Sequence, residues 1–388
     1  MKLNKHIAAL CIGTFCLGVA ELGIVPVLTD VAHSLHVSIP QAGLYISAYA
    51  AGVCAGIIGL LVFARSVNLK YTLLAAAVLI LVGNASAALA QNDYMMLAAR
   101  FISGSPHGIF FALGAVAAQR LAAEGESARD ITLMVLGQTS ANLVGVPLGS
   151  WIGYAFSWRI IFMTIAALSL LLIAALFYWL PSLPVQKKPL KELIQPLRHP
   201  HPWIILAGIA IGSGGFYAYY SYVDPIMSKV SGLPASMMTP VIALAGLSMF
   251  VGNVVSAPLT KHFNDETLVF SGQLLIAFAA LGAYFLSRDE ITSIFMMSLA
   301  AFGYFFIAGP MQALVIKGAG DAKVIIAALG QIAYNGANAI GAYLGGVAID
   351  VSGIASECAL PSLLLGFASS VLFYFVWRSS NRNDLAGD

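Results

Sequence analysis

The stretch IAALCIGTFCLGVAELGIVPVLT, residues 7–29, decides the fold because 23 almost wholly apolar residues stand in one run. A helix needs about 20 such residues to cross the hydrocarbon layer of a bilayer. The one charged residue of the run, Glu21, lies in its outer half. A carboxylate there costs several kcal/mol unless it is paired, hydrated or protonated, so Glu21 marks a polar path into the bilayer.

The rest of the chain has the same character. It is 60% hydrophobic and 9% charged, whereas soluble domains contain about 45 to 50% apolar and 25% charged residues. We therefore predict an all-α membrane protein with twelve transmembrane helices. The expected spans are residues 7–29, 42–63, 71–91, 95–118, 132–155, 159–180, 203–228, 238–260, 267–286, 291–316, 324–349 and 359–377.

Lysine and arginine near the span ends predict the orientation, since cytoplasmic loops carry the excess of positive charge. With a cytoplasmic N terminus, fifteen of these residues fall on the cytoplasmic side. Only Arg100, Arg159, Lys229 and Arg288 fall on or toward the other side. This places both termini in the cytoplasm and predicts a multi-pass protein of the bacterial inner membrane. The net charge of +2 is then an orientation signal, and no nucleic-acid partner is expected.

Lys2 and Lys5 before an apolar stretch are also typical of a cleaved signal peptide. The run continues to Leu28, which favours an uncleaved first span. The four cysteines contain no CxxC pair, so we expect them to be packing residues and predict no metal site.

An internal repeat divides the chain. Gly137-Gln138 with Asn142 recurs as Gly330-Gln331 with Asn335, 193 residues later. Gly59 and Gly252 share that displacement, and Asp30 and Asp224 differ by 194. Spans five and eleven run in the same direction. We therefore predict two parallel six-helix repeats, the arrangement in which a transporter holds its substrate between the halves.

The segment 181–202 contains six prolines and four basic residues, so it cannot span the membrane. We predict a six-helix bundle over residues 1–181, a cytoplasmic linker over 182–202 and a second bundle over 203–388. Leu190, Leu193, Ile194 and Leu197 fit a short amphipathic helix on the headgroups, and a solvated linker is the alternative.

Arg100 is about one and a half turns inside span four, at a depth similar to that of Glu21. The two can meet if their helices are neighbours. The alternative for Arg100 is a side chain that extends toward the outer headgroups. His107, seven residues on, lies on the same helix face near the bilayer centre. It is a candidate for a substrate or proton role, or a structural histidine bonded to a backbone carbonyl.

Glu21 has the properties of a proton carrier because two influences oppose each other. Apolar surroundings favour the neutral acid, and a nearby guanidinium favours the carboxylate. A small movement, or the arrival of substrate, would then change its protonation. The alternative is a permanent ion pair between Glu21 and Arg100 that only joins spans one and four.

Polar side chains in other spans complete a candidate cavity. The amides on the two repeated helices can bind a hydroxylated ligand or bond between helices. Gly212, Gly214 and Gly215 are expected to weaken span seven before a run of aromatic residues, whereas Tyr222 and Asp224 are expected in the outer interface belt. The candidate cavity residues are His107, Gln138, Asn142, Tyr217, Gln331, Asn335 and Asn338. Span five carries the packing and gate candidates Gly145, Pro147 and Gly149.

No enzyme motif competes with transport, since GxxxxGK[ST], HExxH and GxSxG are all absent from the sequence. We expect no enzymatic activity and no cofactor. The energy must then come from an ion or solute gradient.

Several strings resemble a known group: Arg100-Phe-Ile-Ser-Gly104-Ser-Pro106-His107-Gly108, the run from Gly137 through Pro147 and Gly149, and Gly330-Gln331-Ile-Ala-Tyr-Asn335. They are similar to the drug:proton antiporter branch of the major facilitator superfamily, in particular the AraJ-like arabinose efflux permease group. The resemblance implies a proton-driven exporter of sugars or drug-like compounds. It also implies a proton-relay role for Arg100 and an antiporter motif over Gly145 to Gly149.

One motif of that family is incomplete here. The loop between spans two and three usually reads GxLaDRxGRK, and this chain has Gly59-Leu-Leu-Val-Phe-Ala-Arg65-Ser-Val-Asn-Leu-Lys70. Arg65 and Lys70 keep the charge, but the Asp is missing. The intracellular gate attributed to that Asp cannot be carried over.

The sequence thus predicts a monomeric antiporter that exports a small solute, with Glu21 as the proton site and Arg100 as its modulator. A sugar facilitator that moves no protons is the first alternative. A membrane sensor, which would bind ligand without moving it, is the second.

Overall fold

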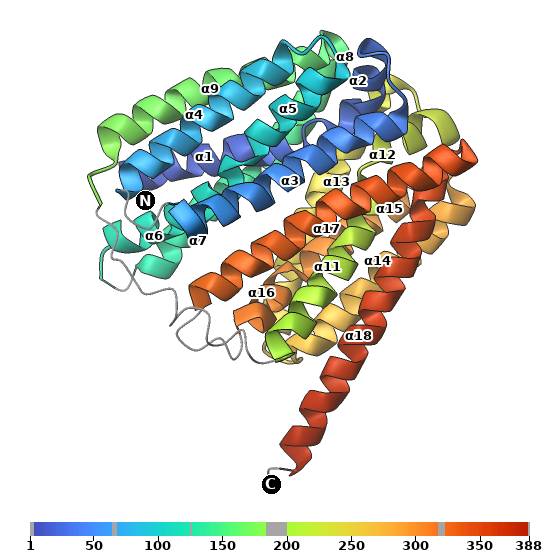
Figure 1. Ribbon diagram of the computed structural model, residues 1–388. Helices are drawn as coiled ribbons and strands as arrows, with labels where there is room; N and C mark the ends of the chain where they lie inside the picture. Colours follow the sequence, from blue (N-terminus) through green and yellow to red (C-terminus); the bar gives the residue numbers. More distant parts are fainter. Residues whose placement is uncertain (1–3, 64–67, 125, 184–199, 317–322, 387–388) are drawn as a thin grey trace. The chain divides into compact units, whose positions relative to one another are not determined.

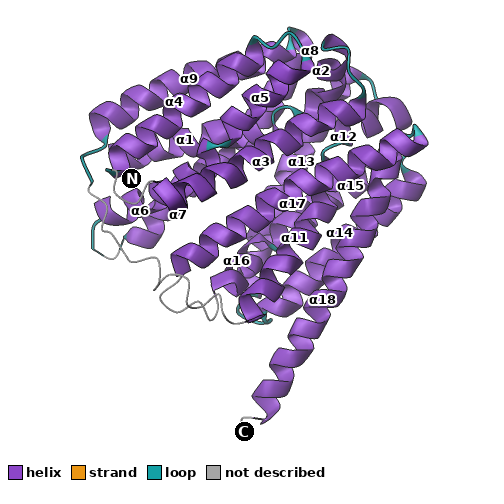
Figure 2. Cartoon of the chain, in the orientation of Figure 1, coloured by secondary structure: helices purple, strands orange, loops and turns teal. Residues whose placement is uncertain are grey.

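The computed structural model describes residues 4–63, 68–124, 126–183, 200–316 and 323–386. Within these ranges every regular element is a helix, and the helices are joined by short turns (Figure 2). The Cα positions group into two compact units, Met1–Lys188 with Met238–Ala243, and Pro189–Met237 with Leu244–Asp388.

In the first unit, α1 lies against α7 and α9, α3 lies along α5, and α4 lies along α9 (Figure 1). The elements are α1 (Lys5–Leu22), η1 (Val25–Val27), α2 (Leu28–Ser34), α3 (Ile39–Phe63), α4 (Leu69–Ala88), α5 (Asp93–Gly104), α6 (Pro106–Leu121), α7 (Ser127–Ser140), the π-helix η3 (Ala141–Gly145), α8 (Val146–Ala155) and α9 (Trp158–Trp179).

In the second unit, α11 lies along α17 and α18, and α14 packs between α15 and α18. The elements after residue 199 are α11 (Pro200–Tyr220), α12 (Val223–Pro225), the π-helix η5 (Ile226–Val230), η6 (Ala235–Met237), α13 (Met238–Leu259), α14 (Asp265–Leu286), α15 (Glu290–Phe306), α16 (Ala308–Ile316), α17 (Lys323–Ser352), η8 (Ala355–Cys358) and α18 (Ala359–Ala386). The first turns of α13 group with the first unit.

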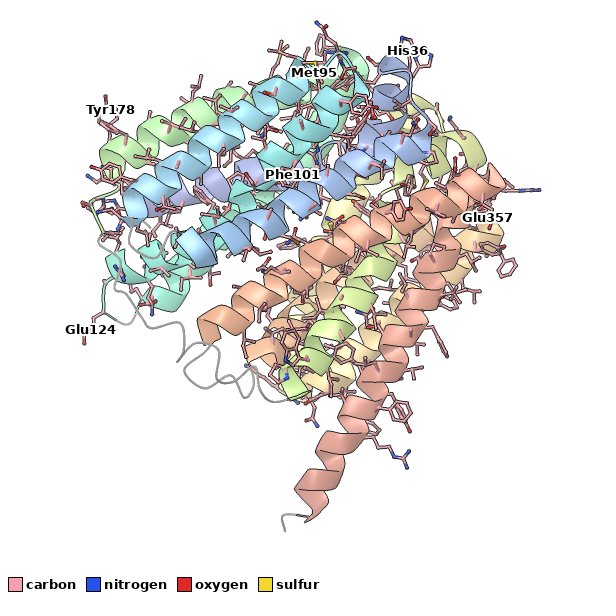
Figure 3. The ribbon with its side chains drawn as sticks, in the orientation of Figure 1. His36, Met95, Phe101, Glu124, Tyr178 and Glu357 are labelled. Carbon is pink, nitrogen blue, oxygen red and sulfur yellow. The ribbon has the colours of Figure 1, made fainter. Side chains whose placement is uncertain are left out.

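Eleven segments among the described residues are long and apolar enough to cross a membrane. The helix α17, 30 residues long, is not one of them, and it carries Gln331, Asn335 and Asn338. It occupies the predicted eleventh span, so the expected count of twelve is approximately supported. Large side chains such as Phe101 and Tyr178 are exposed, at 43% and 77% (Figure 3).

Capping side chains account for several helix starts. Asn92 accepts a hydrogen bond from the Met95 amide at 3.0 Å and begins α5, and Ser157 accepts one from the Arg159 amide at 3.3 Å and begins α9. Each cap satisfies an amide that has no partner within its own helix. The predicted linker ends earlier than expected, because α11 already begins at Pro200 and a proline fits the first turn of a helix.

The predicted fourth span consists of two helices, because the helix is interrupted at Ser105: α5 ends at Gly104 and α6 begins at Pro106. Proline has no amide hydrogen, so the carbonyl of Ile102 loses its usual partner. The Ser105 hydroxyl donates to that carbonyl at 2.8 Å instead. Arg100 therefore ends up in α5 and His107 in the first turn of α6.

The second unit contains an equivalent break, between Phe306 of α15 and Ala308 of α16. In the first unit, a Cβ added at Gly52 would meet the backbone of Phe101 in α5. In the second, a Cβ at Gly252 would meet the backbone of Phe302 in α15. The equivalence of Gly59 with Gly252 was therefore wrong. A Cβ added at Gly59 would meet nothing within 4 Å among the described residues, whereas Gly52 makes the matching contact.

Candidate functional site

Arg100 lies inside the first unit with no exposed surface. Its guanidinium donates to three main-chain carbonyls, those of Ala20 at 2.6 Å, Tyr45 at 3.2 Å and Glu21 at 3.3 Å. Its central carbon lies 4.5 Å from the centre of the Tyr49 ring. The alternative of a side chain extended toward the headgroups is wrong, because carbonyls of α1 and α3 bind the charge inside the protein.

Glu21 of α1 is half-buried, and its main-chain carbonyl is one of the acceptors of Arg100. Its carboxylate accepts a hydrogen bond from the amide nitrogen of Gln138 in α7, at 3.4 Å. It is also close enough to Tyr49, Arg100 and His107 to interact electrostatically with each of them. The structure thus brings together four of the predicted site residues: Glu21, Arg100, His107 and Gln138.

Tyr49 of α3 joins the two separate parts of the fourth span. Its hydroxyl lies 2.9 Å from Nδ1 of His107 and 3.2 Å from the carbonyl of Leu17 in α1. Phe111 stacks on the ring of His107, with ring centres 5.1 Å apart. A single tyrosine therefore contacts both the guanidinium of Arg100 and the imidazole of His107.

The predicted bend in span five takes the form of a π-helical turn before Pro147. The amide of Val146 donates to the carbonyl of Ala141, five residues back, and α8 then starts with Pro147 in its first turn. Asn142 lies in this turn. It is 5% exposed, and its side-chain oxygen has no hydrogen-bond partner within the described parts of the chain.

The glycines of span five differ in how tightly they pack. A Cβ at Gly145 would lie 2.9 Å from the Phe15 ring of α1. A Cβ at Gly149 would meet Ile161 of α9 no nearer than 3.5 Å, an ordinary contact. Close packing against α1 therefore applies to Gly145 and does not extend to Gly149.

The second unit holds the other predicted amides on α17. Asn335 is 7% exposed and donates to the carbonyl of Gln331 at 2.9 Å. Asn338 is 1% exposed. Gln331 is half-buried. These three residues lie in a helix without a π-turn, because no proline follows the repeated motif here.

Tyr217 belongs to an aromatic cluster in the second unit. Phe216 and Tyr304 stack with centres 4.1 Å apart, and Tyr217 meets Tyr304 edge to face at 5.7 Å. The expected weakening of span seven was wrong: α11 runs unbroken from Pro200 to Tyr220. Its glycines admit neighbouring helices instead, since Gly214 lies against α17.

Tyr222 and Asp224 were also placed wrongly. Both are buried, at 0% and 1% exposure, and the Tyr222 hydroxyl donates to the carbonyl of Ala342 at 2.7 Å. They lie inside the second unit and do not face an outer interface. A tyrosine next to an acidic residue is typical of a membrane interface. The burial of these two side chains depends on neighbouring helices that the local sequence does not reveal.

Comparison with known proteins settles the family. The sequence profile of the Major Facilitator Superfamily matches residues 10–342. The chain belongs to this superfamily. It is 36% identical over 385 residues to the protein named as transporter AraJ of Escherichia coli (strain K12). The alignment covers 98% of each chain.

Other similarities of this major facilitator chain extend over nearly its full length. It is 29% identical to the inner membrane transport protein YdhP of Escherichia coli (strain K12), over 96% of each chain. The crystal structure of a D-xylose–proton symporter superposes with a TM-score of 0.75 at 15% identity, covering 95% of this chain and 97% of that one. The chain is thus a multi-pass membrane transporter of small molecules, and the expectation that it is not an enzyme is confirmed.

Sequence reasoning missed two polar groups of this major facilitator chain. Tyr49 did not stand out from the apolar residues of span two. Only the tertiary structure shows that it contacts α1, α5 and α6. Gln273 of α14 has no exposed surface, and its amide has no hydrogen-bond partner within the described ranges. An amide inside an apolar span was a signal that could have singled out Gln273.

The incomplete loop motif is only partly described. Arg65 lies outside the described residues, as does the proposed amphipathic segment around Leu193. Lys70 donates to the carbonyl of Phe177 in α9 at 2.7 Å. The first turn of α4 is therefore tied to the last turn of α9.

Proposed function

We propose that this chain exports a small polar or amphipathic solute, such as arabinose or a drug-like compound, in exchange for protons. Transport proceeds by alternating access, with Glu21 as the proton site and Arg100 as its modulator. The observation that carries the proposal is the half-buried Glu21, whose carboxylate accepts a hydrogen bond from Gln138 and whose main-chain carbonyl accepts one from the buried Arg100. An ionisable side chain at such a place in a membrane span is typical of a proton or ion pathway.

The bonds of Arg100 support a titrating Glu21. Its three hydrogen bonds described above end on main-chain carbonyls, whose acceptor strength does not depend on the charge of Glu21. Arg100 therefore stays in place when Glu21 takes a proton. A permanent ion pair that only joins two helices would not need this separate set of acceptors.

The proposed solute-binding residues are those expected from the sequence. In the first unit these are His107, Gln138 and Asn142, and in the second they are Tyr217, Gln331, Asn335 and Asn338. Amides and an imidazole offer both donors and acceptors, which suits hydroxylated compounds. Gly145, Pro147, Gly149 and Arg65 are proposed to act in packing and gating.

We further propose that the protein works as a monomer in the bacterial inner membrane. The similarity to YdhP, an inner membrane transport protein, supports this location, and the similarity to AraJ supports transport. The distribution of lysine and arginine supports cytoplasmic termini.

The test is flux in sealed proteoliposomes. Pentoses, nucleosides and cationic drugs are screened with an inside-acid or inside-alkaline gradient, and we expect at least one to move only with the gradient. Glu21→Gln keeps the shape but cannot bind or release a proton, so gradient-dependent flux should vanish. Glu290→Gln, at an exposed position in the first turn of α15, is the matched control and should transport normally.

Two outcomes would contradict the proposal. Flux that is unchanged in Glu21→Gln and insensitive to the gradient would identify a facilitator. Ligand binding without any flux under either gradient would identify a sensor.

A further inference from the structure

Tyr49 has one hydroxyl proton and two hydrogen-bonding neighbours. The Leu17 carbonyl, 3.2 Å away, can only accept, whereas Nδ1 of His107, 2.9 Å away, donates in one tautomer and accepts in the other. Tyr49 is 1% exposed and His107 is 7% exposed, so water has little access to either contact.

The proton count separates the two tautomers. If Nδ1 carries the proton, it donates to the Tyr49 oxygen, and the Tyr49 hydroxyl donates to Leu17. Both short contacts are then hydrogen bonds. If Nδ1 is unprotonated, the single hydroxyl proton of Tyr49 can be donated either to Nδ1 or to the Leu17 carbonyl, and the other acceptor lacks a hydrogen bond. Because polar groups in a buried site favour the arrangement with the most hydrogen bonds, Nδ1 carries the proton.

The ring of His107 cannot easily turn over to exchange its nitrogens. Phe111 stacks on one face at an interplanar angle of 18°, and Tyr49 meets the ring edge to face at 81°. Turning the ring by half a revolution would break the bond from Nδ1 and disturb both aromatic contacts.

We propose that Tyr49 is a positioning residue that holds neutral His107 in the Nδ1–H tautomer, so that Nε2 presents its lone pair to a hydroxyl or ammonium group of the solute. The tautomer follows from the geometry of the first unit alone. The part that concerns the solute rests on the proposed function.

Neighbouring groups agree with a donor-bearing solute. The Glu21 carboxylate is an acceptor when ionised, and the buried side-chain oxygen of Asn142 has no partner within the described residues. Together with Nε2 of His107 they make the polar surface of this unit rich in acceptors. Arg100 adds little donor capacity for a solute, since it has no exposed surface and three of its five N–H groups already donate to carbonyls.

The tautomer is measured by nitrogen-15 NMR of the full chain labelled at histidine and reconstituted in lipid. The chain has seven histidines, so the signals of His107 are identified by their loss in His107→Gln. We expect a protonated Nδ1 and a bare Nε2 at neutral pH. A bare Nδ1 with a protonated Nε2 in the wild-type protein would overturn the inference, and this result needs no other variant.

The role of Tyr49 is measured with Tyr49→Phe. Loss of its hydroxyl should convert His107 to a mixture of tautomers, while the ring at position 49 keeps its edge-to-face contact and Phe111 stays stacked on His107. Tyr154→Phe is the matched control: it removes a hydroxyl that donates to the Pro26 carbonyl at 2.9 Å and should leave the His107 signals unchanged. An unaltered Nδ1–H tautomer in Tyr49→Phe would show that another group holds the ring.

Transport separates this inference from the proposed function. With L-arabinose as the probe, Tyr49→Phe should raise KM roughly fivefold and leave the maximal rate within about twofold, as expected for one weakened hydrogen bond. An unchanged KM would contradict the role of Nε2 in binding. Absence of arabinose flux in the wild type would count against that solute and leave the NMR result on the tautomer intact.

Discussion

At the scale of single residues, Arg100 illustrates how a full positive charge is accommodated in an apolar interior. A guanidinium has several N–H donors in a fixed planar fork, and three carbonyls from α1 and α3 meet it. The Tyr49 ring covers its face. A lysine at the same place would keep the charge but have a shorter reach and a different donor geometry.

Arg100→Lys should therefore destabilise the protein although the charge is kept. We expect a loss of about 2 to 4 kcal/mol, because one or two hydrogen bonds to a charged group disappear in a buried site. Thermal unfolding in detergent measures the change. The exposed Arg288→Lys should unfold like the wild type, and equal stability of Arg100→Lys would contradict the importance of the three-carbonyl arrangement.

At the scale of elements, glycine sets how closely α1 and α7 approach. A Cβ at Gly18 would lie 2.6 Å from the Cβ of Ala141 and 3.0 Å from the side-chain oxygen of Gln138. Gln138 is the residue that donates to Glu21. The packing of two helices and the environment of the proposed proton site are therefore linked through one small residue.

Gly18→Ala should displace Gln138, lengthen its bond to Glu21 and cost roughly 1 to 3 kcal/mol through overpacking. The measurement combines thermal unfolding with gradient-driven flux, and both should fall. Gly59→Ala is the control, because a Cβ there would meet nothing within 4 Å in the part of the chain that the structure describes, and alanine favours a helix more than glycine does. Equal effects of the two substitutions would mean that the α1–α7 contact has no special role.

The two repeated helices also show how one proline changes an element. The motif at Gly137 is followed by Pro147, and residue 340, the same distance after Gly330, is isoleucine. The first helix widens into a π-turn and restarts as α8, whereas α17 continues unbroken for 30 residues. The repeat was visible in the sequence, and so was the bend, but the i to i+5 form of the bend was not.

At the scale of the whole molecule, the excess of basic residues on one side predicts that both termini lie in the cytoplasm. A green fluorescent protein fused after Asp388 should fluoresce in bacterial cells, and alkaline phosphatase at the same place should be inactive. The opposite pattern is expected for fusions after His36, at the turn that follows the first span. Active phosphatase at Asp388 would contradict the even number of spans.

The sequence by itself determined the membrane class, the approximate spans, the half-length repeat and the presence of Glu21 and Arg100 inside spans. These follow from composition and hydropathy, which are properties of short segments. Only the tertiary structure decided that Arg100 binds carbonyls, that Tyr49 joins it to His107, that Gly52 is the counterpart of Gly252, and that Tyr222 is buried. Such facts depend on which faces of distant helices meet, and local hydropathy does not encode the rotation or crossing of a packed helix.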